Sequence, residues 1–184
     1  MAVLYGSNES WKELIDASAG PNHFFISQSD IRYQYELGCI SHESCAAILG
    51  IRTYFQKVAD ATEEQPIRKT IEQVYGNFAR WECPLTERLF NYLKSKPNIT
   101  ILGSTSTERR VPTISFTHSN RSSKDIVAHL NQHNIACRNG HMYAYRLVDQ
   151  LHIDLDDGVV RLSAVHYNTI DEIERCILVL ESIL

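Results

Sequence analysis

The sequence has few of the features that mark disordered, secreted or membrane-spanning chains. Only 5 of its 184 residues are proline, 22% are charged and 43% are hydrophobic, a composition that excludes extensive disorder. No apolar run approaches the roughly 20 residues needed to span a bilayer. The start also lacks the basic segment and sustained apolar run of a signal peptide. We therefore expect a folded cytoplasmic chain with no membrane partner.

Paired cysteines and metal-ligand clusters are also scarce. The 5 cysteines are odd in number, and no two of them stand in a C-x-x-C spacing, which excludes a secreted disulfide framework and a zinc ribbon. His129 and His133 stand four residues apart on an expected helix, but no third ligand is near them in sequence. The sequence therefore predicts reduced thiols and no metal site.

Dense basic segments are absent as well. The formal net charge is -4 and the isoelectric point is about 6.0, whereas nucleic-acid-binding chains usually carry a basic patch or stripe. The densest pair of cations is Arg109–Arg110, which we interpret as part of a solvated loop. We expect no nucleic-acid partner.

The first half of the chain predicts long helices beside short strands. Apolar residues recur at helical spacing in its longer segments, Pro66 suits a first helical turn, and Pro97 ends the last helix. Pro84 should kink that helix or divide it in two. The expected elements are strands at 2–5 and 24–26 and helices at 10–18, 41–61 and 66–96.

The second half predicts a compact α/β unit of strands with helices on one face. Ser122 or Ser123 can cap one helix, and Thr169 and Glu172 form a capping box at the start of the last one. Asp156 to Gly158 is a turn signal before a strand of alternating apolar and polar residues. The expected elements are strands at 99–102, 111–116, 135–137 and 159–165, and helices from 122 or 123, at 142–151 and from 169.

Three stretches stand out when taken together. They are Y-E-L-G-C-I-S-H-E at 35–43, C-R-N-G-H-M-Y at 137–143 and R-L-S-A-V-H-Y-N-T at 161–169. Their order and spacing resemble the cysteine desulfurase-like branch of the class V aminotransferases, a group of fold-type I enzymes that use pyridoxal phosphate (PLP). The last stretch resembles that family's R-x-S-x-x-x-Y-N-T signature, the middle one its R-x-G-H motif, and the first its E-x-G-T-P segment.

The resemblance implies an α/β (α+β) fold. It predicts the C-terminal small domain of a fold-type I transferase, with a small, mainly antiparallel sheet and helices on one face. Residues 1–65 would be a remnant of the PLP-binding large domain, 66–96 a long connecting helix, and 97–184 the small domain.

The resemblance also implies roles for single residues near the substrate. Arg161 matches the arginine that receives the α-carboxylate of an amino-acid substrate, and a planar guanidinium suits that bidentate contact. Arg138 and His141, in the R-x-G-H stretch, match residues that line the active-site entrance. Tyr143 stands where cysteine desulfurases place the loop with their nucleophilic cysteine. Cys137 falls on an expected buried strand, where a thiol is usually inert.

Gly38 and Cys39 match the Gly-Thr pair that approaches the PLP phosphate from the partner subunit. Glycine allows close approach of the backbone, and a backbone N–H can bind phosphate. Because cysteine replaces threonine here, a hydroxyl donor is lost from that contact.

The family also needs a lysine that binds PLP, and in the family it lies just upstream of the stretch that resembles residues 1–6. None of the six lysines of this chain lies in a matching motif. We therefore expect a fragment that begins just after that lysine, is inactive alone and requires PLP only in its full-length parent. Exposed apolar faces would favour a homo-oligomer or association with the missing large-domain half.

Three functions remain open at this stage. The first is a segment of a PLP enzyme that performs transamination, β-elimination or desulfuration on an amino acid. The second is a non-catalytic module that keeps the small-domain fold and binds a carboxylate ligand or regulates a full-length paralogue. The third is an unrelated α/β enzyme, for which the sequence shows no catalytic constellation.

Overall fold

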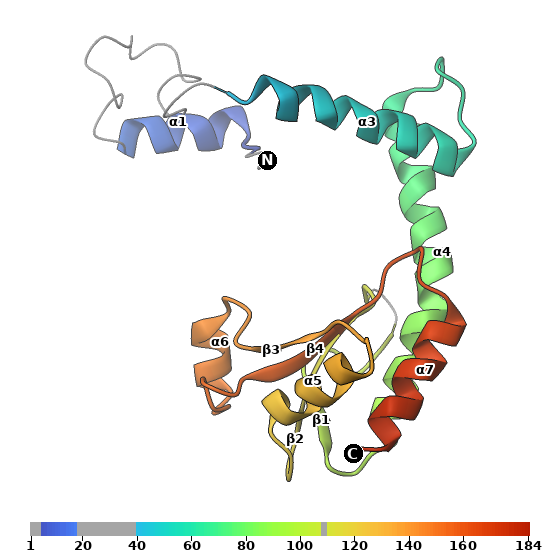
Figure 1. Cartoon of the computed structure of the whole chain (residues 1–184). Helices are drawn as coiled ribbons and strands as arrows, with labels where there is room; N and C mark the ends of the chain where they lie inside the picture. Colours follow the sequence, from blue (N-terminus) through green and yellow to red (C-terminus); the bar gives the residue numbers. More distant parts are fainter. Residues whose placement is uncertain (1–4, 18–39, 108–109) are drawn as a thin grey trace. The chain divides into compact units, whose positions relative to one another are not determined.

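The computed structural model describes residues 5–17, 40–107 and 110–184, which divide into two compact units, Met1–Glu64 and Gln65–Leu184 (Figure 1). The expected strands at 2–5 and 24–26, and the candidate residues Gly38 and Cys39, lie outside the described residues. Within the described ranges, no helix has both the length and the apolar character needed to cross a membrane. The division of the chain at 65 and 96 stays a prediction.

The described part of the N-terminal unit consists of α1 (Asn8–Ala17) and α3 (His42–Ala59), as the helical spacing predicts. The side chain of Ser41 caps α3 by accepting a hydrogen bond from the Ser44 N–H at 3.2 Å. Neither helix buries a residue, and Leu49 is 71% exposed. The apolar spacing of α3 therefore predicted a helix correctly, but the apolar side chains of this helix are not buried within the described N-terminal unit.

The C-terminal unit is built on a four-stranded sheet in the order β1-β2-β4-β3, and every neighbouring pair is antiparallel. The strands are β1 (Ile99–Ile101), β2 (Thr113–His118), β3 (Arg138–Gly140) and β4 (Val159–Ser163). The predicted small antiparallel sheet is confirmed.

Three helices cover one face of this sheet: α4 (Ile67–Lys94), α5 (Ser123–Gln132) and α7 (Ile170–Glu181). Alternate residues of the central strands point to them, so that Ile114, Phe116, Val160 and Leu162 are buried in one core. The short helix α6 (Tyr145–Gln150) lies apart from these helices, at the end of β3 and β4 (Figure 1). Helices α4, α5 and α7 do not cover the opposite face of the sheet, which we call the open face.

Helix α4 runs through Pro84 as one helix, so of the two predicted outcomes, a kink or a division into two helices, the division is wrong and the kink stays a prediction. Proline removes one helical hydrogen bond and crowds the preceding turn, at a cost of about 3 kcal/mol. Directly after it, Leu85, Leu89 and Leu93 are buried in the core. Burial of several such side chains stabilises the helix by more than the proline destabilises it, since each contributes about 1.5–3 kcal/mol.

Two predicted elements are displaced along the chain. The strand expected at 135–137 is instead β3, because Asn134 has a φ of +58° and the Ile135 N–H donates to the Leu130 carbonyl, which ends α5 as a left-handed turn. The helix expected from 142 begins only at Tyr145, since Met142 and Tyr143 have φ values of +50° and +63°.

The predicted starts of α5 and α7 are confirmed. Ser122 rather than Ser123 is the cap of α5, and its hydroxyl accepts from the Asp125 N–H at 3.0 Å. At α7, the Thr169 hydroxyl accepts from the Glu172 N–H, while the Glu172 carboxylate accepts from the Thr169 N–H at 2.8 Å. This capping box fixes the chain immediately after β4 and its arginine.

Candidate functional site

Arg161 and Arg138 lie next to each other on neighbouring strands. Arg161 on β4 pairs in register with Arg138 on β3 and with Ser115 on β2. Because Val160 and Leu162 on either side of Arg161 are buried in the core, Arg161 belongs to the open face. Together with Ala136, Cys137 and Ser163, the two arginines line a shallow hollow of about 240 Å³.

This pair of cations is not neutralised within the described part of the chain. Like charges directly opposite each other on neighbouring strands destabilise a sheet. The ion pairs found among residues 5–17, 40–107 and 110–184 join other groups, and none of them includes Arg138 or Arg161. Adjacent guanidinium groups are able to bind an anion through paired N–H donors.

A second hollow, of about 320 Å³, lies between the open face of the sheet and α6. Arg161 and Ser115 line it from the sheet, and Leu147 and Val148 line it from the helix. Arg161 therefore borders two adjoining hollows, one shared with Arg138 and one with α6. Both lie entirely within the C-terminal unit.

Arg110 also lines this second hollow. It lies on a loop, as expected, but it is not fully solvated. It is half-buried: one guanidinium nitrogen donates to the Leu102 carbonyl at 3.1 Å, and the group lies 5.2 Å from the centre of the Phe90 ring. Its neighbour Arg109 lies outside the described residues. The nearby expected strand was a signal that could have placed Arg110 beside the sheet.

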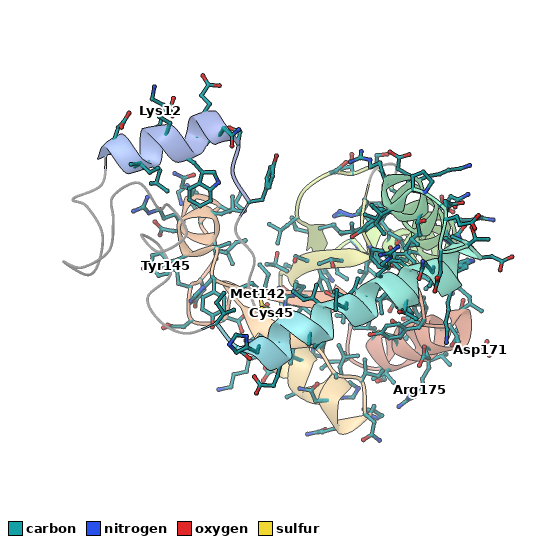
Figure 2. The ribbon with its side chains drawn as sticks, turned by 90° about the horizontal axis from the view of Figure 1, so that it is seen from above. Lys12, Cys45, Met142, Tyr145, Asp171 and Arg175 are labelled. Carbon is teal, nitrogen blue, oxygen red and sulfur yellow. The ribbon has the colours of Figure 1, made fainter. Side chains whose placement is uncertain are left out.

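His141 connects β3 to the second hollow. Its Nδ1 accepts a hydrogen bond from the Tyr143 N–H at 3.2 Å, across the two left-handed residues. The ring lies 5.7 Å from that of Tyr145, edge to face, and Tyr145 is the first residue of α6 (Figure 2). The R-x-G-H stretch thus places Arg138 at one hollow and His141 at the other, while Tyr143 is fully exposed.

Two glycines hold β3 against the turn before β4. Gly140 and Gly158 have φ values of +124° and +66°, and a Cβ on Gly158 would lie 2.2 Å from the carbonyl carbon of Gly140. The turn is also tied to α5, because the Asp157 carboxylate accepts from the backbone N–H groups of Ser123 and Lys124 at 2.7 and 2.9 Å. These contacts set the position of Arg138 relative to Arg161.

The thiol at this site is not activated. Cys137 lines the first hollow and is half-buried, and burial raises the pKa of its thiol to about 11. It does not lie on a strand as expected, but it remains a protonated thiol near neutral pH. Since the thiolate is the nucleophile, this environment does not support nucleophilic chemistry at Cys137.

Comparison with solved structures places the fold. The apo structure of a cysteine desulfurase from Thermococcus onnurineus NA1 superimposes with a TM-score of 0.55 and 28% identity, over 63% of this chain and 28% of that one. The four-stranded antiparallel sheet of this chain, with its three covering helices, therefore has the fold of the C-terminal small domain of a fold-type I PLP-dependent enzyme.

The family follows from the sequence comparison. The model of the class V aminotransferases matches residues 68–176, from the start of α4 to α7, and this chain belongs to that family. It is 38% identical to an aminotransferase-like protein of Gibberella zeae over 187 aligned residues, which cover all of this chain and 42% of the relative. It is 29% identical to a cysteine desulfurase-like protein of Aspergillus flavus, over 94% of this chain and 37% of the relative. The chain thus spans less than half the length of these relatives.

Proposed function

We propose that this chain is the substrate-binding part of a PLP-dependent class V enzyme that acts on an amino acid. Arg161, with Arg138 beside it, receives the α-carboxylate of that substrate. The observation that carries the proposal is the pair of cross-strand arginines on an open sheet face, with no ion-pair partner among the described residues. Orientation of a carboxylate by such a pair fixes the reacting end of the substrate.

The described residues do not by themselves fit PLP. All six lysines are described; Lys96 bonds to Glu181 at 2.7 Å, the other five are exposed, and none lines either hollow beside Arg161. Gly38 and Cys39, the proposed contacts to the PLP phosphate, lie outside the described residues. When bound, PLP acts as the electron sink for chemistry at the amino acid's α-carbon. We propose that a longer parent supplies the lysine, and that this chain alone is inactive.

For the reaction of that parent we propose a class of PLP-dependent reactions rather than a single one. The relatives are named aminotransferase-like and cysteine desulfurase-like, so transamination, β-elimination and desulfuration remain its candidates. Desulfuration through a cysteine of this site is disfavoured, since Tyr143 stands at the loop position and the Cys137 thiol is protonated.

We also propose that the chain associates with a second copy or with a large-domain segment. Within the N-terminal unit, α3 leaves Ile48, Leu49, Ile51 and Tyr54 exposed on a helix with no buried residue. A group of exposed apolar residues of this kind is typical of a surface that another protein covers. Light scattering tests this proposal, and a clean monomer at high concentration would contradict it.

A non-catalytic binding or regulatory module is the second candidate. The observation that favours it is the absence of a lysine and of an activated thiol from the hollows beside Arg161 in the described structure. Such a module would bind the same carboxylate but would perform no chemistry with any partner.

Calorimetric titration with L-alanine tests the carboxylate site. Arg161→Gln should weaken binding about ten-fold or more, because a charge-assisted hydrogen bond contributes about 1.5–3 kcal/mol. Arg146→Gln is the matched control, since Arg146 is exposed on α6 and lines neither hollow. Equal loss in both variants would contradict the proposal.

A mixing experiment separates the two candidates. PLP is added to this chain, with and without a large-domain chain that carries the lysine, and turnover of amino acids is measured. Activity that returns only in the mixture supports the enzyme segment; carboxylate binding without activity in any mixture supports the module. Borohydride reduction that labels one lysine of this chain stoichiometrically would contradict the need for a partner.

A further inference from the structure

The hollow beneath α6 carries a second fixed cation besides Arg161. Arg161 enters it from β4, and Arg110 enters it from the segment just before β2. Arg110 is held in place by the carbonyl oxygens of Leu102 and Ser104, which accept from its two terminal nitrogens at 3.1 and 3.4 Å. Its position over the Phe90 ring restricts the guanidinium further.

The described lining of this hollow carries more positive than negative charge. Its lining contains both arginines and His141 but no aspartate or glutamate among the described residues. The Nε of Arg110 is buried and has no hydrogen-bond partner in the described structure. Because this nitrogen is buried, it is not the atom that meets a ligand in the hollow. Each terminal nitrogen of Arg110 donates to one carbonyl and has a second N–H, and these are the donors that remain for a negatively charged ligand.

Between the two arginines the lining is apolar. Leu102, Met142, Val148 and Val159 contribute hydrocarbon surface to the same hollow. Its volume of about 320 Å³ is at the small end for ligand sites, which are typically about 300–1,000 Å³. A short chain of methylene groups with a negative charge at each end matches cations at two walls and apolar surface between them.

We propose that the substrate of this site is a dicarboxylic amino acid, whose α-carboxylate binds Arg161 and whose side-chain carboxylate binds Arg110. This inference rests on the proposed role of Arg161 and adds the substrate class. Arg110 is then a specificity-determining residue: it distinguishes a charged side chain from its neutral amide.

Calorimetric titration of the unaltered chain with matched ligands is the first test. L-aspartate and L-glutamate are compared with L-asparagine and L-glutamine, which have the same shape without the second charge, and with L-alanine. At least one diacid should bind about ten-fold more tightly than its amide. Equal affinity for both acids and their amides would overturn the inference, while binding of L-alanine that depends on Arg161 would still support the carboxylate site.

Substitutions then locate the second charge. Arg110→Gln should abolish the preference for the diacid over its amide, and Arg110→Lys should restore part of that preference. Arg161→Gln should weaken the binding of all five ligands, whereas Arg146→Gln should leave all five affinities unchanged. Retention of the preference in a folded Arg110→Gln chain would overturn the assignment of Arg110. Unfolding of that variant would leave the ligand comparison on the unaltered chain as the deciding measurement.

Separate titrations with the diacids and with inorganic phosphate distinguish a substrate carboxylate from a phosphate as the anion that binds Arg110. The Arg110 Nε–H resonance is followed by NMR during titration with L-aspartate, L-glutamate or inorganic phosphate. A shift that saturates with a diacid at lower concentration than with phosphate supports the substrate carboxylate. Saturation by phosphate first would show an inorganic-phosphate or cofactor-phosphate site and overturn the inference.

Discussion

Helices α3 and α7 both carry apolar residues at helical spacing, but only α7 buries them. The 18-residue α3 has no buried residue, whereas Ile173, Cys176, Ile177 and Leu180 of the 12-residue α7 are buried in the core of the C-terminal unit. The difference is the sheet: α7 packs with α4 and α5 over β2 and β4, and the described N-terminal unit contains no strand. Amphipathic spacing predicts a helix, while burial depends on what that helix packs against.

The largest expected effect tests this contrast directly. Leu93→Ala should destabilise the C-terminal unit by about 2–5 kcal/mol, because Leu93 is fully buried and its truncation leaves a cavity. Leu49→Ala in α3, at a side chain that is 71% exposed, should change stability by less than about 0.5 kcal/mol. Urea unfolding followed by circular dichroism measures both. A cost at Leu49 as large as that at Leu93 would show that α3 is buried in solution.

Substitution of one glycine in each unit provides a second comparison between the packed C-terminal unit and the exposed helix α3. Gly158→Ala should cost about 2–3 kcal/mol, because the new Cβ would collide with Gly140 at 2.2 Å and φ is +66°. Gly50→Ala in α3 should instead stabilise by about 0.5–1 kcal/mol, since no heavy atom lies within 4 Å and alanine favours the helix.

The readout for the glycine pair is the melting temperature of each variant, together with its affinity for L-alanine. Gly158→Ala should weaken L-alanine binding as well, because the turn sets the register of β3. Unchanged stability in Gly158→Ala would contradict the tight contact between the two glycines.

Local signals explain which parts of this fold were predictable from sequence. The caps at Ser122 and Thr169 act within one turn of their own helices, so neighbouring residues suffice to predict them. The division of the helix at Pro84 does not occur, because Leu85, Leu89 and Leu93 pack against elements far along the chain and stabilise the helix beyond the proline. The strand at 135–137 was misplaced because a left-handed turn at Asn134 separates these apolar residues from β3.

In the candidate site, too, some features could be predicted from local sequence and others depend on the fold. Arg161 and Arg138 were predictable because each lies in a motif with recognisable spacing. Their pairing was not, because it depends on the register between β3 and β4. Arg110 was missed because its contacts to Leu102 and Phe90 join segments whose proximity only the folded sheet creates.

The helix caps give the next smaller effect. Thr169→Ala should destabilise the C-terminal unit by about 1 kcal/mol, since the hydroxyl that accepts from the Glu172 N–H is lost. Ser41→Ala removes the corresponding cap of α3. Hydrogen exchange should show faster opening of the first turn in each variant, but only Thr169→Ala should lower the protection of the β4 amides. Loss of β4 protection in Ser41→Ala would show that the two units unfold together.

The smallest expected effect concerns the charge in the α7 capping box. The pKa of Glu172 is lowered chiefly because its carboxylate accepts a hydrogen bond from the Thr169 N–H, with a further contribution from Asn168. A carboxyl whose pKa is lower in the folded state adds stability above its unfolded pKa of about 4.3. That stability is lost as the pH falls through the lowered folded value.

Melting temperatures of the unaltered chain and of Glu172→Gln should therefore differ slightly at pH 6–7 and converge as the pH falls below about 4. Glu43→Gln in α3 is the matched control: Glu43 also lies in a first helical turn, but its described contact is the Ser41 hydroxyl at 3.3 Å rather than a backbone N–H. Since Glu172 fixes the turn after β4, a difference that instead grows toward low pH would mean that its carboxylate destabilises this turn.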